Sequence, residues 1–370
     1  MILTGLFNHA NGQFGHEHSF HHFRTFDNIQ SLPVILSRAG YRTARWGKYH
    51  VGPEEVYKFE EIIKGGGSPA GGAEKCRAVI ESENNKPFFL YFCTHEPHRP
   101  FKREGSDKFK SEDVIVPPYL PDIPECREEL AEYYGSVQRS DVGLLELIKI
   151  LKHSGKWRNT VIIYCSDNGV AFPGAKTTLY EPGMRLPFVV YDGGAKSKRI
   201  KTDAMISFVD ITPTILDYAG VDITEREFHG RSFRGLVQNG EAEGFDEIYA
   251  SHTFHEITMY YPMRVVRNRR CKLIWNIAHG LDYPFASDLW ASKTWQAVLK
   301  RGDEYYGKRK IENYLHRPEF ELYDLEKDPH EINNLADDTN YANIFKEMKE
   351  KLKVFQQRTK DPWIVKWEYE

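Results

Sequence analysis

The 370-residue sequence has no apolar run long enough to cross a lipid bilayer. Its first residues form neither a basic segment nor a cleavable apolar core. We therefore expect no membrane span and no signal peptide in the printed chain. Lysine and arginine (50) nearly balance aspartate and glutamate (53), which gives a net charge of -3. Such a charge provides no global field that would recruit nucleic acid or an anionic membrane.

Cysteine is scarce. The five cysteines lie far apart, are odd in number and show no zinc or redox spacing. The sequence also contains no Asn-x-Ser/Thr site that could accept an N-linked glycan. These absences exclude the common cysteine motifs and weaken the case for a heavily glycosylated secretory protein.

Apolar runs and helical patterns alternate between residues 31 and 220. The runs at 87–93 and 161–165 lack the alternation of a half-exposed strand, so we expect strands covered on both faces. Additional strands are predicted at 41–46, 186–191 and 204–209, and helices at 31–39, 72–83, 125–152 and 213–219. This order predicts an α/β domain with a doubly wound, mostly parallel sheet.

The pattern changes near residue 240, where the strands become shorter and the turns denser. Strands are predicted at 247–250, 263–267, 272–277 and 321–325, followed by a closing helix at 341–357. We therefore predict two units, a larger α/β domain over residues 1–240 and a smaller C-terminal α+β subdomain over residues 241–370.

Polar residues follow the strand expected at 161–165. Because open α/β sheets bind ligands at the carboxyl ends of their strands, Asp167 and Asn168 would lie at a binding edge. Their oxygens are ligands for hard cations. An ordinary turn is the alternative, since Asp, Asn and Gly end strands for purely local reasons.

Three other predicted strand ends and loops carry reactive side chains, and each alone could be a surface or capping residue. Together with Asp167 and Asn168 they fit a pocket for a tetrahedral dianion. A metal and lysines would hold its oxygens, and histidines would move protons. The additional residues are Lys48, His50, His98 and Lys176.

The blocks around these residues resemble the type I sulfatases, which have the alkaline-phosphatase-like fold. The resemblance covers essentially the whole chain and comes nearest to the branch that acts on N-sulfoglucosamine of heparan sulfate. The blocks include Gly47-Lys48-x-His50, Pro97-His98-x-Pro100, Ser166-Asp167-Asn168-Gly169, Lys176-Thr177-Thr178-x-x-Glu181, His255-Glu256-Ile257-Thr258-Met259 and Asp361-Pro362-Trp363.

The resemblance implies a role for each of these residues. Asp167 and Asn168 would bind calcium, and Lys48 and Lys176 would hold sulfate oxygens. His50 would be the base that later expels sulfate, and His98 would protonate the leaving group. His255, Glu256 and Arg264 would line the sugar pocket. The expected partner is a sulfated glycosaminoglycan or sugar. Relatives are lysosomal or exported, including periplasmic ones, and the sequence leaves both the location and a homodimer open.

Five histidines crowd a Gly- and Asn-rich stretch near the start of the chain. Imidazoles suit transition metals, but the oxygen ligation expected elsewhere favours a pocket-lining or structural loop over such a site. The residues are His9, His16, His18, His21 and His22.

One part of the sulfatase pattern is absent. The family nucleophile is a formylglycine made from a Cys/Ser-x-Pro-x-Arg motif, and no cysteine here stands in such a motif. Alignment through Thr4-Gly5-Leu6 puts the motif upstream of Met1, together with a strand that carries two aspartates. We therefore expect the printed chain to be truncated and inactive by itself. Its calcium binding should be weak or absent, because calcium takes about six to eight oxygens.

Two alternatives remain beside a sulfatase. The first is a phosphatase or phosphodiesterase of the same superfamily, although those enzymes generally use two transition metals and more His and Asp ligands. The second is a non-catalytic protein that binds sulfated glycans.

Overall fold

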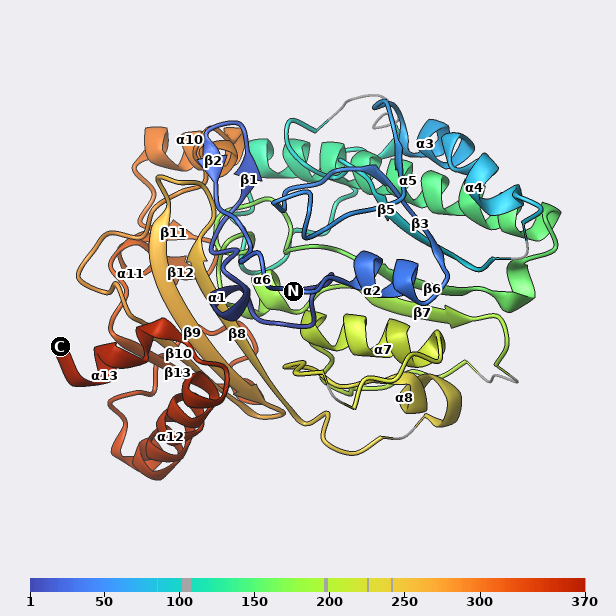
Figure 1. Ribbon diagram of the computed structural model, residues 1–370. Helices are drawn as coiled ribbons and strands as arrows, with labels where there is room; N and C mark the ends of the chain where they lie inside the picture. Colours follow the sequence, from blue (N-terminus) through green and yellow to red (C-terminus); the bar gives the residue numbers. More distant parts are fainter. Residues whose placement is uncertain (85, 102–107, 196–198, 225, 241, 370) are drawn as a thin grey trace.

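The computed structural model describes residues 1–84, 86–101, 108–195, 199–224, 226–240 and 242–369. An α/β domain and a C-terminal subdomain lie side by side (Figure 1). The domain contains a parallel sheet in the order β4 (Glu61–Ile63), β3 (Arg42–Gly47), β5 (Phe88–Cys93). Beside it lies an antiparallel pair, β6 (Val161–Cys165) and β7 (Phe188–Asp192). The expected α/β class, with a parallel sheet and a C-terminal subdomain, is confirmed.

Helices cover both faces of these strands. The side chains of a strand point alternately to opposite sides, so neighbouring residues pack against different helices. Phe88 and Leu90 of β5 pack in a cluster on one side of the sheet, whereas Phe89 and Tyr91 pack in a cluster on the other side. The helices α3 (Pro69–Lys75), α4 (Arg77–Glu81) and α5 (Pro124–His153) lie on one side (Figure 1). The helices α2 (Leu32–Arg38), α7 (Ile211–Tyr218) and α8 (Arg234–Asn239) lie on the other.

Two sequence predictions differ from the structure. The helix expected at 72–83 is two helices that meet at Cys76. The strand expected at 204–209 is wrong. There the chain forms a 3-10 turn, η3 (Phe208–Asp210), in which the Ser207 amide donates to the Asp210 carboxylate at 2.7 Å. This local capping box satisfies backbone groups that a strand would have paired with a neighbour.

A large cavity separates the parallel sheet from the β6–β7 pair, and we call it the slot. Its volume is about 2350 Å³, and every residue of β5 and β6 lines it. Within the described residues β5 pairs only with β3, and β6 only with β7. Helices cover both faces of β5 and β6, as expected, but all residues of both strands are only half-buried, because one edge of each strand faces the slot. Each strand presents an unpaired backbone edge to the slot.

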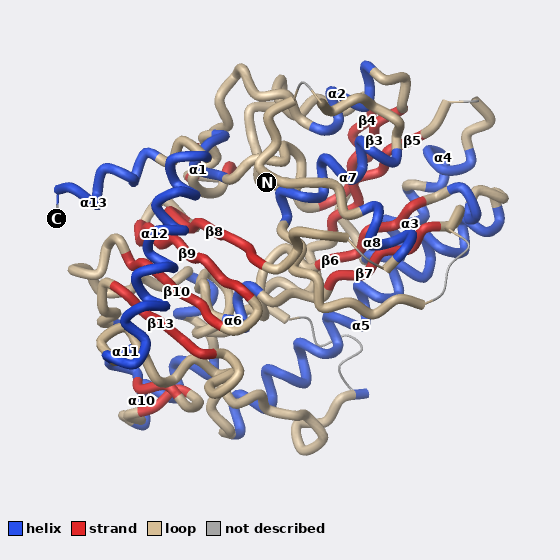
Figure 2. The backbone as a smooth tube through the Cα atoms, turned by 90° about the horizontal axis from the view of Figure 1, so that it is seen from below, coloured by secondary structure: helices blue, strands red, loops and turns tan. Residues whose placement is uncertain are grey.

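The C-terminal subdomain is built on a four-stranded antiparallel sheet. Its order is β13 (Phe320–Asp324), β10 (Cys271–Asn276), β9 (Tyr260–Asn268), β8 (Glu247–Phe254). Figure 2 shows α12 (Ala342–Arg358) lying across these strands. The smaller elements are α1 (Asn8–Asn11), β1 (Glu17–His18), β2 (His21–His22), η2 (Trp157–Asn159), α6 (Glu181–Met184), α9 (Ser287–Trp290), α10 (Lys293–Arg301), β11 (Tyr305–Tyr306), β12 (Arg309–Lys310), α11 (Ile311–Leu315), η4 (Thr339–Tyr341), η5 (Pro362–Val365) and α13 (Lys366–Tyr369).

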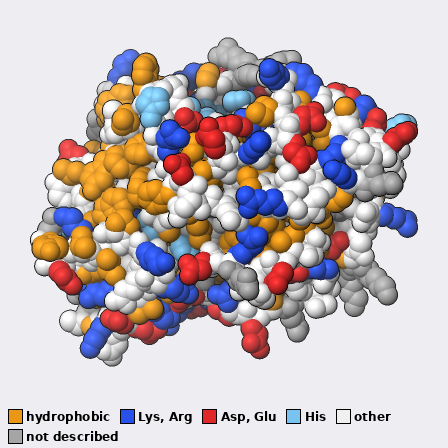
Figure 3. All heavy atoms as spheres, viewed as in Figure 1, with side chains coloured by type: hydrophobic (Ala, Val, Ile, Leu, Met, Phe, Trp, Pro, Cys, Tyr) orange, Lys and Arg blue, Asp and Glu red, His pale blue; other side chains and the backbone are white. Residues whose placement is uncertain are grey.

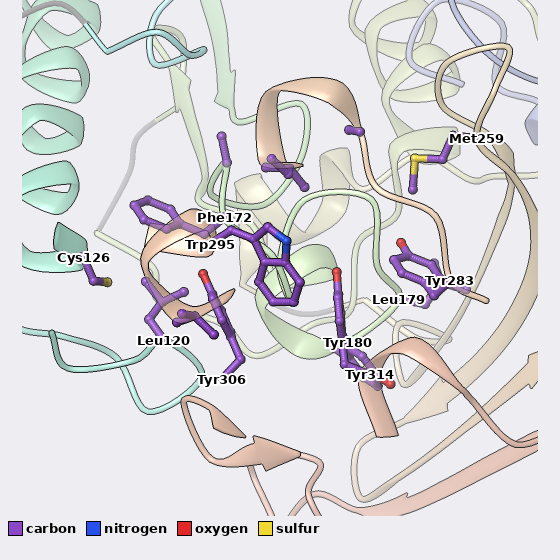
Figure 4. Packing of buried hydrophobic residues seen from close by; sticks show 14 of the residues in the cluster. Leu120, Cys126, Phe172, Leu179, Tyr180, Met259, Tyr283, Trp295, Tyr306 and Tyr314 are labelled. Atoms are coloured by element: carbon purple, nitrogen blue, oxygen red, sulfur yellow. The ribbon is translucent and has the colours of Figure 1, made fainter. Parts of the chain in front are cut away.

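The two parts share an aromatic core, drawn in Figure 4, in which Phe172 and Tyr180 of the α/β domain join Tyr283 and Trp295 of the subdomain. A buried ammonium adds to this junction. Lys272 of β10 lies 2.8 Å from a carboxylate oxygen of Glu181, which stands in the α/β domain. The subdomain is therefore fixed against the loop that follows β6.

The face drawn in Figure 3 shows no dominant charge. Acidic and basic side chains are interspersed on the face in Figure 3, and apolar side chains gather mainly over the C-terminal sheet. In the described part of the chain, no helix is long and apolar enough to span a membrane.

Candidate active site

Lys48 is placed at one end of the slot by the glycine before it. Gly47 has φ +89°, and a Cβ there would lie 1.8 Å from the Cys93 carbonyl oxygen, so only glycine fits this close approach. The Lys48 amide donates to the same carbonyl at 2.8 Å. Its ammonium then reaches across to Asp167, with 2.9 Å between Nζ and Oδ2.

Asp167 and Asn168 follow β6 in a tight turn. The Ser166 hydroxyl donates to the Asn168 carbonyl at 2.7 Å, and a Cβ on Gly169 would lie 2.2 Å from the Pro182 carbonyl oxygen. Partial burial opposes ionisation of Asp167, but the Lys48 ammonium beside it holds the pKa of this carboxyl below its usual value. The carboxylate is therefore charged at neutral pH and points into the mouth of the slot.

His98 and Lys176 meet on the other side of the mouth. Lys176 is buried, and its Nζ lies 3.4 Å from Nε2 of His98. Burial lowers the pKa of His98, and the Lys176 ammonium lowers it further. The next residue, Thr177, has a left-handed φ of +70° and accepts a hydrogen bond from the Tyr283 hydroxyl at 2.7 Å. The subdomain therefore holds this strained turn in place.

The sequence did not predict Asp288. This residue lies in α9 of the C-terminal subdomain, and its Oδ2 accepts a hydrogen bond from Lys176 at 2.8 Å. Its Oδ1 is buried and has no hydrogen-bond partner among the described residues. No motif surrounds Asp288, and only the packing of the subdomain brings it to the pocket.

His50 lies beside Lys48 among other imidazoles. Its ring centroid is 4.1 Å from that of His18 and 5.2 Å from that of His16. Burial and the neighbouring Lys48 charge lower the pKa of His50 to about 3. The ring is therefore neutral at physiological pH.

Of the three residues expected to line a sugar pocket, two line the slot and one does not. His255 and Glu256 line the slot near its mouth, and the Glu256 carboxylate accepts a hydrogen bond from the Ser287 hydroxyl at 2.8 Å. Arg264 is fully buried, and its Nη2 donates to Oδ1 of Asp361 at 2.9 Å. It does not line the slot. Its position gives no support to a role in substrate binding.

The residues around Asp167 do not make a complete calcium site. Asp167 and Asn168 offer side-chain oxygens, but Lys48 already contacts the carboxylate. Within the described residues no group of three carboxylates or histidines forms around Asp167. Because calcium takes about six to eight oxygens, most of its donors would have to come from elsewhere.

The pocket as a whole suits a compact anion. The structure brings Asn168 and five other predicted residues together, which arrive from the ends of β3, β5 and β6 and from the loop after β6. The two lysines supply positive charge, and the two histidines are neutral proton carriers. These five residues are Lys48, His50, His98, Asp167 and Lys176, and all of them line the slot.

The chain matches two described protein families. Residues 1–221 match the sulfatase family, and residues 174–284 and 301–358 match the family described as N-sulphoglucosamine sulphohydrolase, C-terminal. In an alignment 404 positions long, the chain is 33% identical to human N-sulphoglucosamine sulphohydrolase. The alignment covers 98% of this chain and 80% of the human protein.

Solved structures show the same fold. A Bacteroides thetaiotaomicron sulfatase from a locus for glycosaminoglycan metabolism has a TM-score of 0.73 at 18% identity, over 98% of this chain and 84% of that chain. The phosphonate monoester hydrolase of Agrobacterium radiobacter has a TM-score of 0.68 at 17% identity, over 97% of this chain and 85% of that chain. The expected alkaline-phosphatase-like fold is thereby confirmed.

Proposed function

The chain belongs to the sulfatase family, and on that basis we propose that it forms the larger part of an enzyme that removes N-linked sulfate from glucosamine residues of heparan-type glycans. The match of the C-terminal subdomain and the human relative support this substrate class. The observation that carries the proposal is the convergence of Lys48, His98 and Lys176 on one pocket.

Each converging side chain has a role in this proposal. Lys48 and Lys176 hold the sulfuryl oxygens and offset the charge that develops on them in the transition state. His98 protonates the leaving nitrogen. In the free pocket burial and Lys176 lower the pKa of His98, and an anionic ligand between them has the opposite effect. His50 accepts the proton from the nucleophile.

The slot supports a second part of the proposal, that another strand supplies the nucleophile. The chain enters the pocket at the carboxyl end of β5 and again at the carboxyl end of β6, so the two strands run in the same direction. A parallel strand inserted between them would satisfy both unpaired edges and deliver its own carboxyl end to the pocket. We assign this strand to residues encoded upstream of Met1. They would carry the nucleophile and the remaining calcium donors.

A formylglycine at that strand end would supply the hydrated aldehyde oxygen that attacks sulfur. His50 lies close to Lys48, and Lys48 is itself paired with Asp167. This arrangement keeps the proton-accepting ring at the mouth of the slot, where the strand would end. Asp167 and Asn168 would contribute two of the oxygens that hold calcium.

The test compares native protein with the printed chain. The mass of the native amino terminus is determined, and sulfate release from N-sulfoglucosamine is measured for the native protein and for the chain that begins at Met1. We expect an upstream segment and activity only when it is present. Full activity of a protein that begins at Met1 would overturn the proposal of a strand supplied from upstream.

Two further outcomes would replace the proposed reaction. Faster turnover of phosphate or phosphonate esters than of sulfate esters by the extended protein would favour the phosphatase alternative. Binding of heparin fragments without sulfate release, by a native protein that begins at Met1, would favour a glycan-binding role.

A further inference from the structure

Three histidines converge beside the proposed active site. His16 precedes the short strand β1, His18 lies within it, and His50 follows β3. One ring nitrogen from each residue lies within 4.8 Å of the others. The Glu17 amide donates to the His50 carbonyl at 3.2 Å, and this bond fixes the β1 segment against the residues after β3.

The three rings can serve as ligands at neutral pH. Burial lowers the pKa of His16 to about 3, and the neighbouring His50 and His18 add to this effect. The pKa of His50 is lowered to about 3 by burial and by Lys48. Nδ1 of His50 is buried and has no hydrogen-bond partner within the described residues. Buried polar atoms normally have such a partner, so this nitrogen is free to bind a ligand.

The donor set selects the class of metal. Neutral imidazoles suit zinc and similar transition metals, whereas calcium requires oxygen. In a tetrahedral zinc site with Zn–N bonds of about 2.0–2.1 Å, the nitrogens lie roughly 3.3–3.4 Å apart. Ring rotations that shorten the present separations, none of which exceeds 4.8 Å, would bring the three nitrogens to that spacing.

Neighbouring charges act in both directions. The Lys48 ammonium disfavours a cation, but it is paired with Asp167 at 2.9 Å. Burial and the neighbouring His21 lower the pKa of His18, and the carboxylates of Glu17 and Glu256 oppose this lowering because they favour positive charge there. The ring of His255 packs on His16 from the subdomain, with 4.1 Å between centroids, and limits the freedom of the His16 ring.

We propose that His16, His18 and His50 bind a zinc-class divalent ion, with a fourth position open to water. The site is separate from the oxygen donors Asp167 and Asn168. An ion held there occupies a lone pair of His50 and prevents this ring from accepting a proton. Zinc would therefore inhibit hydrolysis. The inhibition rests on the proposed function, whereas the metal binding does not.

Metal binding is tested on the full chain with zinc alone. Isothermal titration in a buffer that contains calcium measures affinity and stoichiometry, and zinc-edge X-ray absorption identifies the ligands. We expect one ion per chain with three imidazole ligands at about 2.0–2.1 Å. His16→Gln and His18→Gln should each weaken binding at least about tenfold, because each removes a direct ligand. His153→Gln is the matched control, since His153 is exposed at the end of α5.

Circular dichroism establishes that the variants remain folded, and two separate variants guard against an effect of one substitution on the loop. Absence of zinc binding, or equal affinity in the His18→Gln and His153→Gln variants, would overturn the site. If zinc binds but sulfate release by the extended protein is unchanged, the inhibition is rejected. If that protein releases no sulfate even without zinc, the proposed function fails and the metal site stands.

Discussion

Lys48 and Asp167 stand 119 positions apart in the sequence, and their side chains form an ion pair of 2.9 Å at the mouth of the slot. The Asp167 side chain is 60% exposed, so solvent screens the pair and its contribution to stability is small. The pairing instead keeps a carboxylate oxygen and an ammonium together in the pocket until a ligand separates them.

Lys48→Met should therefore separate activity from stability. We expect the free energy of unfolding to change by less than about 1 kcal/mol, because the Asp167 carboxylate is exposed and solvent screens the pair. In the extended, active protein, kcat/KM should fall roughly 10²–10³-fold, as for loss of one group that stabilises transition-state charge. Urea unfolding and sulfate release measure the two effects.

Lys310→Met is a matched control, since Lys310 forms a surface ion pair of the same 2.9 Å length with Glu304. It should leave both measurements unchanged. A large loss of stability in Lys48→Met alone would show that the pair holds the fold together.

Lys176 and Asp288 form the opposite kind of pair. Lys176 is 3% exposed, and its Nζ lies 2.8 Å from Asp288. Lys176→Met should destabilise the protein by about 1–3 kcal/mol, because it leaves a mostly buried carboxylate without its donor. It should also raise the pKa of His98, since one cause of the lowering disappears while burial and Lys48 remain.

Denaturant unfolding and NMR titration of His98 test this expectation. Lys176→Met combined with Asp288→Asn should recover part of the lost stability, because no unpaired carboxylate remains. An additive double variant would show that the two residues do not interact.

Arg264 provides a third test, because its burial gives no support to the pocket role that the sequence resemblance implied. Arg264→Met would leave Asp361 buried without its main partner, and we expect a loss of roughly 3–5 kcal/mol in unfolding free energy. Arg269→Met, which breaks a surface pair of 2.6 Å with Asp246, should cost less than about 1 kcal/mol. A higher KM for the glycan in a fully stable Arg264→Met variant would instead support a role of Arg264 in substrate binding.

The sequence predicted the strand-end residues well for a physical reason. Apolar runs that stop at Cys93 and Cys165 mark where strands end, and parallel strands bring such ends to one edge. Contacts between residues far apart in the sequence could not be predicted in the same way. Asp288 reaches the pocket only because α9 packs against the loop of Lys176. The antiparallel course of β7 and the open edges of β5 and β6 depend on which strands pair, and local patterning does not specify pairing.

Buried histidines should make the folded state sensitive to acid. Burial lowers the pKa of His9 to about 3 and that of His252 to about 4, whereas both rings titrate near 6.5 in the unfolded chain. Above pH 6.5 neither state binds these protons. As the pH falls below 6.5, the unfolded state takes them up and the folded state does not. Stability therefore falls between about pH 6.5 and pH 4.

Urea unfolding at pH 7, 6 and 5 measures this slope. Each buried histidine contributes up to about 1.4 kcal/mol per pH unit within the window. His9→Gln should reduce the slope by nearly one proton, because the ring that stays neutral in the folded state is removed. An identical slope in His9→Gln would exclude His9 as a source of the acid sensitivity.

The cysteines allow a direct test of the slot. Cys93 and Cys165 end β5 and β6, line the slot and are partly exposed, whereas Cys76 and Cys126 are fully buried. Burial raises the pKa of Cys93, Cys76 and Cys126 to about 12 and that of Cys165 to about 11. Because Cys93, Cys76 and Cys126 share a pKa of about 12, their relative labelling rates at one pH report access rather than thiolate content. The lower pKa of Cys165 by itself accounts for about a tenfold faster rate.

In the printed chain, a small thiol reagent should modify Cys93 roughly tenfold or more faster than the two buried cysteines, which become accessible only through local opening, and Cys165 should react faster still. In native protein that carries an upstream strand, the two slot cysteines should be protected to the level of Cys76 and Cys126. Peptide mass spectrometry after timed labelling gives all four rates in one experiment. Equal protection of the four thiols in the printed chain would mean that the edges of β5 and β6 are already covered, and the strand proposed for the slot would have no place to bind.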